Sequence, residues 1–308
     1  MALVRVENLV KAYTPDGPRA VDDVSFEIQA GEMFSLLGPN GAGKTTTISV
    51  MSTLLTPTAG RVMVDGHDVQ DEAMAVRRDI GVVPQDLALY MELTAEENLR
   101  FWGEMRGLSG AELKHEVAEK LELTELTDRA KDRVNTFSGG MKRRLNLAVG
   151  LLGSPKLVML DEPTVAIDPQ SRRYILDWVK GMAHDGTTVL YTTHYMEEAQ
   201  ELSDRIGIMD QGKLIAIGTL AELTQMVGEH ETLIFQLAQS IGGADLATRI
   251  ESLDGVHQTT SNDGELLVNA DSAEVVLPQV VSAASDLGLN IRTIEIREPN
   301  LETVFLHL

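Results

Sequence analysis

The first 220 residues alternate short apolar runs with segments of helical pattern. Residues 33–37, 157–160 and 187–193 are mainly apolar or threonine, which is typical of strands buried on both faces of a parallel sheet. Residues 205–209 and 213–217 flank Asp210-Gln211-Gly212 and are predicted to form a hairpin. We therefore expect an α/β domain, a sheet covered by helices, over residues 1–220.

A mostly helical insertion is expected after residue 92. Thr94 followed by Ala-Glu-Glu is typical of a helix N-cap with acidic residues in the first turn. The segment shows no sustained heptad, so no long coiled-coil arm is expected from it. We place a helical subdomain at about residues 92–155.

Residues 221–308 are predicted to form a second, smaller domain. Strands and helices alternate there as β-α-β-β-α-β, the order of a ferredoxin-like sandwich. A final helical turn at residues 300–308 presents Leu301, Val304, Phe305 and Leu308 at helical spacing, as if to dock on a neighbour. The predicted elements are residues 231–237, 243–253, 256–260, 265–268, 272–287 and 290–297.

Composition narrows the classes of function. The chain has 308 residues, 43% of them hydrophobic, and no cysteine, so disulfides, thiolate metal sites and thiol nucleophiles are excluded. This is consistent with a reducing cytoplasm. No apolar run approaches the roughly 18 to 20 residues of a membrane-spanning helix, and the N-terminus does not read as a secretory signal. We expect a protein that is soluble by itself.

The charge of the chain disfavours direct binding to nucleic acid. The net charge is −21, and after Ala221 three basic residues face fourteen acidic ones. Such a surface repels phosphate backbones and anionic lipid heads. The simplest interpretation of the acidity is that it keeps the protein in solution.

A glycine-rich loop follows the strand at residues 33–37 and precedes a helical segment. Residues without a Cβ atom let backbone N–H groups curl around phosphate oxygens, and the positive end of the following helix adds to the attraction. Lys44 should contact the β- and γ-phosphates of a nucleotide, and the Thr45 hydroxyl should bind Mg²⁺. The strand before the loop and the helix after it argue against a chance match. The loop is Gly38, Pro39, Asn40, Gly41, Ala42, Gly43, Lys44 and Thr45, followed by Thr46.

Two carboxylates, Asp161 and Glu162, end the strand at residues 157–160. Open α/β sheets bind their ligands at the carboxyl ends of strands. Asp161 is suited to hold Mg²⁺ through water, and Glu162 to act as general base toward an attacking water. The alternative is that one of the two only caps a helix beyond Pro163.

A second glycine turn, made of Ser138, Gly139 and Gly140, precedes a helix predicted at residues 141–152. Its N–H groups form another anion site. One γ-phosphate does not need two glycine cradles from one chain, so the second cradle is expected to serve the nucleotide of another protomer. For the basic run Lys142, Arg143 and Arg144, a solvated face is the favoured interpretation over ligands.

Three further side chains are candidates. Gln85 lies just beyond the short strand at residues 81–84. Tyr13 could stack on adenine, or be an ordinary half-buried tyrosine. His194, directly after a buried strand, could donate to the γ-phosphate, or be structural. No two histidines have metal-ligand spacing, so Mg²⁺ with ATP is the only metal expected.

In order and spacing, these motifs resemble the ATP-binding-cassette (ABC) ATPase family over residues 3–220. The resemblance implies a P-loop NTPase fold and gives Gln85 a role in catalysis and in the Mg²⁺ site. It makes Glu162, His194 and Gln85 the catalytic candidates, and Thr45, Gln85 and Asp161 the metal candidates. The motif assignments it implies are Walker A at residues 38–46, the Q-loop at Gln85, the signature at residues 138–141, Walker B at Asp161 and Glu162, the D-loop at Asp168, the switch histidine at His194 and the A-loop aromatic at Tyr13.

The resemblance also implies partners. In such proteins two cassettes, identical or different, dimerise head to tail, and each ATP lies between one Walker A loop and the signature of the other subunit. Hydrolysis then drives separate membrane permease subunits, which places the chain peripherally on the cytoplasmic face of the membrane. Residues 298–306 resemble the ending of drug-, antibiotic- and lipid-exporter ATPases of the daunorubicin-resistance type. One departure is Val165-Ala166-Ile167, where the common pattern has a glycine at the second position, so the turn is stiffer.

Three alternatives to an exporter subunit remain open. An importer ATPase subunit differs mainly in the ending of the chain. A soluble cassette acting on DNA or ribosomes should show a long coiled-coil insertion or a second cassette, and neither is found in the sequence. A nucleotide sensor without turnover is disfavoured by intact Asp161, Glu162, Gln85 and His194.

Overall fold

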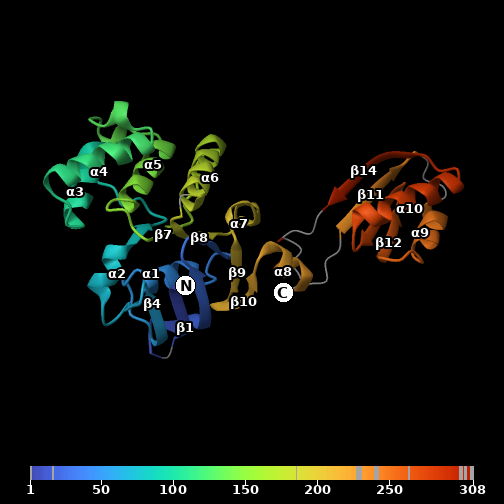
Figure 1. The fold of residues 1–308 in the computed structure, drawn as a ribbon, viewed down its shortest axis with the longest axis horizontal. Coiled ribbons are helices and arrows are strands. Elements are labelled where there is room, and N and C mark those ends of the chain that lie inside the picture. Colours follow the sequence, from blue (N-terminus) through green and yellow to red (C-terminus); the bar gives the residue numbers. More distant parts are fainter. Residues whose placement is uncertain are drawn as a thin grey trace. The chain divides into compact units, whose positions relative to one another are not determined.

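The chain divides into two compact units, Met1–Leu220 and Ala221–Leu308 (Figure 1). The structure is a computed structural model. It describes residues 2–15, 17–184, 186–226, 231–238, 243–262, 264–297, 301, 304 and 305.

An antiparallel sheet with the order β2-β1-β4-β5 covers one side of the first unit. On strand β1, Val4 and Val6 are buried, whereas Arg5 between them is exposed. This alternation is what a sheet with one face in solvent requires. The strands are β1 (Ala2–Ala12), β2 (Arg19–Gln29), β4 (Ala59–Val64) and β5 (His67–Asp68).

A six-stranded sheet with the order β10-β9-β3-β8-β7-β6 forms the centre of the first unit. Its strands are parallel except β10, which forms the predicted hairpin with β9. Every residue of β3, β7 and β8 is buried, as the apolar runs predicted. The strands are β3 (Met33–Leu37), β6 (Ile80–Val83), β7 (Leu157–Asp161), β8 (Thr188–Thr193), β9 (Arg205–Asp210) and β10 (Lys213–Gly218).

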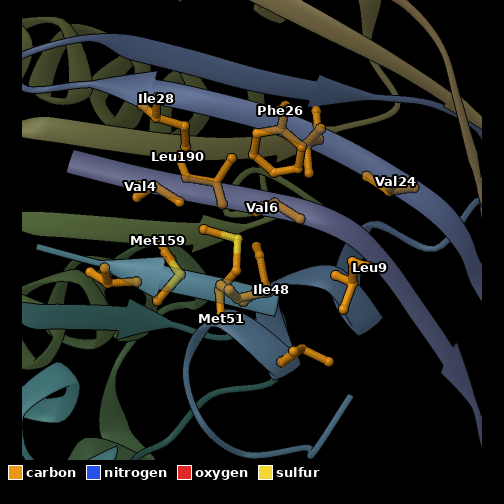
Figure 2. Close-up of a cluster of buried hydrophobic side chains, with 14 of the residues drawn as sticks. Val4, Val6, Leu9, Val24, Phe26, Ile28, Ile48, Met51, Met159 and Leu190 are labelled. Carbon is orange, nitrogen blue, oxygen red and sulfur yellow. The ribbon is translucent and has the colours of Figure 1, made fainter. Parts of the chain in front are cut away.

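Helix α1 (Lys44–Met51) belongs to the core shared by the two sheets. Figure 2 shows Ile48 and Met51 of this helix among side chains of β1, β2, β7 and β8. On β7, Met159 faces this core, whereas Leu160 belongs to the cluster on the other face of the central sheet, with helices α5 (Gly139–Gly150), α6 (Pro169–His184) and α7 (Met196–Leu202). Helix α1 therefore packs against side chains of both sheets.

Helices α3, α4 and α5 form a separate cluster around Leu99, Leu121 and Leu145. The capping role predicted for Thr94 is confirmed, because its hydroxyl accepts from the Glu97 amide at 3.1 Å and the Glu97 carboxylate accepts from the Thr94 amide at 2.8 Å. The remaining helices of the first unit are α2 (Ala73–Asp79), α3 (Ala95–Met105), α4 (Gly110–Leu123), α5 (Gly139–Gly150), α6 (Pro169–His184) and α7 (Met196–Leu202), with 3₁₀ turns at Thr127–Arg129 and Val134–Thr136.

In the second unit an antiparallel sheet has the order β12-β13-β11-β14. With two helices, this is the arrangement of a ferredoxin-like sandwich. Leu301 and Val304 near the end of the chain are buried, while Leu308 of the predicted final turn lies outside the described residues. The elements are β11 (Glu231–Leu237), α9 (Gly243–Ile250), β12 (Val256–Asn262), β13 (Glu265–Ala270), α10 (Ala273–Asp286) and β14 (Ile291–Arg297), preceded by α8 (Leu220–Met226).

None of the helices in the described segments combines the length and apolar character needed to cross a membrane.

Candidate functional site

Four of the predicted site residues, Lys44, Gln85, Glu162 and His194, come after neighbouring parallel strands. Strands β3, β8, β7 and β6 lie side by side, so their carboxyl ends meet at one edge of the sheet. Leu37 pairs with Thr193, and Asp161 pairs with Thr192, so three of these ends are level. The loops that carry Lys44, Gln85, Glu162 and His194 therefore converge, as expected at such an edge.

The glycine loop forms the wall of a pocket of about 390 Å³. Gly43 has φ +104, a left-handed conformation that favours glycine, and a Cβ atom there would lie 2.5 Å from the Ala20 carbonyl oxygen. A Cβ atom on Gly38 would overlap the carbonyl oxygen of Met209. A larger residue at either position would displace the loop. The pocket is lined by Ala20, Asn40, Gly41, Ala42, Gly43, Lys44, Thr45, Thr46, Gln85 and Glu162.

Glu162 lies between a lysine and a histidine at the pocket wall. Its Oε1 is 3.0 Å from the ammonium of Lys44, and its Oε2 is 3.0 Å from Nδ1 of His194. The Lys44 ammonium also donates to the carbonyl oxygens of Gly38 at 2.7 Å and Pro39 at 3.1 Å. Lys44 and Glu162 are both buried. The structure thus brings together a cation for phosphate and a carboxylate with a basic neighbour.

Oxygen ligands suited to Mg²⁺ gather beside the same pocket. Oδ1 of Asp161 accepts from the Thr45 hydroxyl at 3.2 Å and from the Thr192 hydroxyl at 2.7 Å. Gln85 lines the pocket with Thr45. A hydroxyl, a carboxylate and an amide oxygen fit the preference of Mg²⁺ for a few hard oxygen ligands next to phosphates. Thr45, Asp161 and Gln85 are the residues that would hold the ion.

Tyr13 is not half-buried, so that interpretation is wrong. It is 64% exposed, and its hydroxyl lies 3.1 Å from the hydroxyl of Thr46. The ammonium of Lys11 lies 5.8 Å from the ring centroid. An exposed aromatic ring thus lies beside the glycine loop.

The second glycine turn is not among the described residues that line this pocket. Ser138 is the N-cap of α5, because its hydroxyl accepts from the Met141 amide at 3.2 Å. The helix begins at Gly139, earlier than the predicted start at residue 141, because this cap includes both glycines in the first turn. A Cβ atom on Gly140 would overlap the hydroxyl of Ser171 at the start of α6.

The prediction of a solvated basic face after the turn is wrong for Arg143 and Arg144. Arg143 is buried, and its guanidinium donates to backbone carbonyls of the segment that carries Gln85. Arg144 pairs with Glu125 at 3.0 Å and lies 4.9 Å above the ring centroid of Tyr174. Helix α5 packs on both the central sheet and the helical cluster, so cations that a single-helix pattern would place in solvent find partners on other elements.

Sequence reasoning missed a buried carboxylate, Glu198, on α7. It is 1% exposed and accepts from the hydroxyls of Thr164 at 2.7 Å, Tyr191 at 2.9 Å and Thr193 at 2.7 Å, and from Nε of Arg172 at 2.8 Å. Burial, followed by the charge of Glu198, raises the pKa of the Tyr191 hydroxyl well above its ordinary value, so this hydroxyl keeps its proton. The glutamate ties the ends of β7 and β8 to α6.

Asp168 caps α6. Its carboxylate accepts from the Ser171 hydroxyl at 2.7 Å and the Ser171 amide at 2.9 Å, and these bonds lower its pKa. Ala166, at the position where the common pattern has glycine, has φ 59. The left-handed turn is thus kept without glycine, at a steric cost.

Comparison with known proteins agrees with this geometry. Residues 21–165 match the family model described as ABC transporter. The linearmycin resistance ATP-binding protein LnrL of Bacillus subtilis is 46% identical, over 99% of this chain and 98% of the relative. The daunorubicin resistance ATP-binding protein DrrA3 of Streptomyces coeruleorubidus is 41% identical, over 99% and 95% respectively.

A solved structure supports the assignment of the first unit. The cassette MJ0796, described as a dimer in a post-hydrolysis state bound to ADP and phosphate, has a TM-score of 0.64 and 31% identity, over 70% of this chain and 98% of that one. The match covers the length of one cassette, and the relatives above match nearly the whole chain. The chain therefore belongs to the ATP-binding, ATP-hydrolysing subunits of ABC transporters, in the branch of the drug- and antibiotic-resistance exporters.

Proposed function

We propose that two copies of this chain, or this chain and a similar cassette, enclose two Mg²⁺-ATP molecules between them, and that hydrolysis drives export by separate membrane permease subunits. The observation that carries the composite site is the pocket itself. It contains Lys44, Gln85 and Glu162, while Ser138 to Gly140 of the same chain are not among its described lining residues. The second cradle is then available to the nucleotide of the partner.

Each side chain has a distinct role in this proposal. Lys44 and the loop amides hold the phosphates, and Ser138 to Gly140 of the other subunit complete the cradle. Thr45, Asp161 and Gln85 hold Mg²⁺, which when bound neutralises phosphate charge. Tyr13 offers its exposed ring face to adenine.

Glu162 is the general base. It takes a proton from water as the water oxygen bonds to the γ-phosphorus and the bond to the ADP oxygen breaks. His194, 3.0 Å from the carboxylate, orients it and donates to the γ-phosphate. The products are ADP and inorganic phosphate.

The choice of an exporter rests on full-length similarity. The resistance proteins above and a Nod factor export ATP-binding protein of Cupriavidus metallidurans match 99% or more of this chain, including the second unit. We infer a drug-, antibiotic- or lipid-like substrate and a peripheral location on the cytoplasmic face of the membrane. Co-purification with a permease from detergent extract tests the membrane partner and the location.

Mixed dimers test the shared site. Lys44→Ala mixed with Ser138→Arg leaves one intact site per mixed dimer, although each variant alone has none. Random mixing should restore about a quarter of the wild-type hydrolysis rate if the two sites of the symmetric dimer act independently. The matched control mixes Lys44→Ala with Glu162→Gln. Both residues lie on the Walker A side of a site, so each of the two sites in the mixed dimer carries one of the substitutions and neither is intact. Equal activity in the two mixtures would contradict a shared site.

Lys44→Ala should by itself weaken ATP binding. The ammonium makes charge-assisted bonds worth about 1.5–3 kcal/mol, so the dissociation constant should rise by roughly 10- to 150-fold. Equilibrium binding of a fluorescent ATP analogue measures this. Lys180→Ala, which removes a lysine that pairs with Glu201, is the control. Unchanged affinity in Lys44→Ala would remove this lysine from the site.

A further inference from the structure

A side chain of helix α5 makes hydrogen bonds to the backbone of the segment that carries Gln85. The guanidinium of Arg143 donates through Nη1 to the carbonyl oxygens of Pro84 at 3.2 Å and Gln85 at 2.9 Å. These two carbonyls follow immediately after β6. Their hydrogen-bond donor is thus a helix side chain and not the backbone of a neighbouring strand.

Asn146, one turn further along α5, holds the same segment at a second point. Its amide donates to the Pro84 carbonyl at 3.3 Å, and its Oδ1 accepts from the Ala88 amide at 2.9 Å. Asn146 is 1% exposed. The backbone from Pro84 to Ala88 is therefore fixed to α5 at both ends.

Burying the Arg143 guanidinium is costly. The residue is 5% exposed, and its described hydrogen-bond partners are carbonyl oxygens. Burial lowers the pKa of this guanidinium, and the nearby charges of Asp86 and Asp161 oppose that effect. A buried cation is weak evidence for stability. Arg143 lies on α5, the helix that starts at the turn from Ser138 to Gly140, and it contacts the segment that carries Gln85. This position points to a role in holding the two segments in a fixed arrangement.

We propose that Arg143 is a positioning residue that holds the Gln85 segment and the turn from Ser138 to Gly140 as one rigid unit. This rests on the proposed function, in which Gln85 faces the nucleotide of its own chain and the turn faces that of the partner. A displacement of Gln85 at one site is then carried through α5 to the cradle of the other site. The link is made of four hydrogen bonds within one chain.

The test uses Arg143→Met and Arg143→Lys in the full chain. Methionine fills similar volume without donors, so kcat should fall about 10- to 100-fold, as expected for a misplaced site, while equilibrium ATP affinity stays within about twofold because the glycine loop is intact. Lysine retains donors for the two carbonyls and should recover part of kcat. Arg144→Met, which removes the neighbouring guanidinium from contacts with Glu125 and Tyr174, should keep kcat near wild type.

A double-mutant cycle with Gln85→Ala separates positioning from simple stabilisation. If Arg143 acts through the Gln85 segment, the double variant should be no slower than the slower single variant. If the fold-losses in kcat of the two single variants multiply in the double variant, and the wild-type protein hydrolyses ATP, the inference about Arg143 is wrong while the proposed function stands. If Arg143→Met does not fold, Arg143→Lys completes the cycle. A wild-type protein without ATP hydrolysis would overturn the proposed function, and this inference with it.

Discussion

Replacing Glu162 with glutamine is expected to lower kcat by about 10²- to 10⁴-fold, the usual worth of a positioned general base. Glutamine keeps the shape of the side chain and an oxygen for Lys44 or His194, both 3.0 Å from the carboxylate. It does not take a proton from water. ATP should therefore bind and remain bound, and the ATP-bound dimer should accumulate.

Two measurements check this expectation. Steady-state phosphate release gives kcat, and size-exclusion chromatography with ATP gives the dimer fraction. Glu197→Gln is the matched control, because Glu197 is exposed and lies three residues after His194. Hydrolysis by Glu162→Gln at the wild-type rate would exclude Glu162 as the base.

Replacing Glu198 with alanine is expected to lower the free energy of unfolding of the first unit by about 3–5 kcal/mol, because three buried hydroxyls lose their acceptor and each unsatisfied buried group costs about 1–3 kcal/mol. The substitution leaves the hydroxyls of Thr164, Tyr191 and Thr193 without their acceptor and Arg172 without its carboxylate. Buried polar groups left unsatisfied cost more than a hydrogen bond contributes when made.

Tryptophan fluorescence during urea denaturation follows this unit, because both tryptophans, Trp102 and Trp178, lie within Met1–Leu220. Glu201→Ala is the control on the same helix. Its pairs with Arg173 and Lys180 are partly exposed, so a loss below about 1 kcal/mol is expected. Equal losses in the two variants would show that the buried network does not stabilise the fold.

Much of the site follows from local sequence, because its residues lie next to strands that sequence identifies well. Asp161 and His194 lie at or directly after the end of an apolar run, and Lys44 follows the glycine loop that comes after another such run. Parallel strands bring such ends to one edge, so apolar runs and glycine spacing are enough to expect a shared pocket.

What sequence did not predict depends on contacts between distant elements. The partners of Arg143 lie 58 and 59 residues away, and Glu198 contacts Thr164 34 residues earlier. A cation on a helix and a glutamate on a helix look like solvent-facing residues when only their own helix is considered. The exposure of Tyr13 is likewise a property of the assembled surface.

The turn after β7 has a consequence for the evolution and engineering of this protein. Glu162 and Ala166 have φ values of 44 and 59, a conformation that costs a residue with a side chain roughly 1–2 kcal/mol. The surrounding fold therefore imposes this turn against its own conformational preference. Glycine at residue 166 would relieve the steric cost and loosen the turn that carries Glu162. At residue 166 this chain therefore carries a steric cost that the glycine of the common pattern avoids.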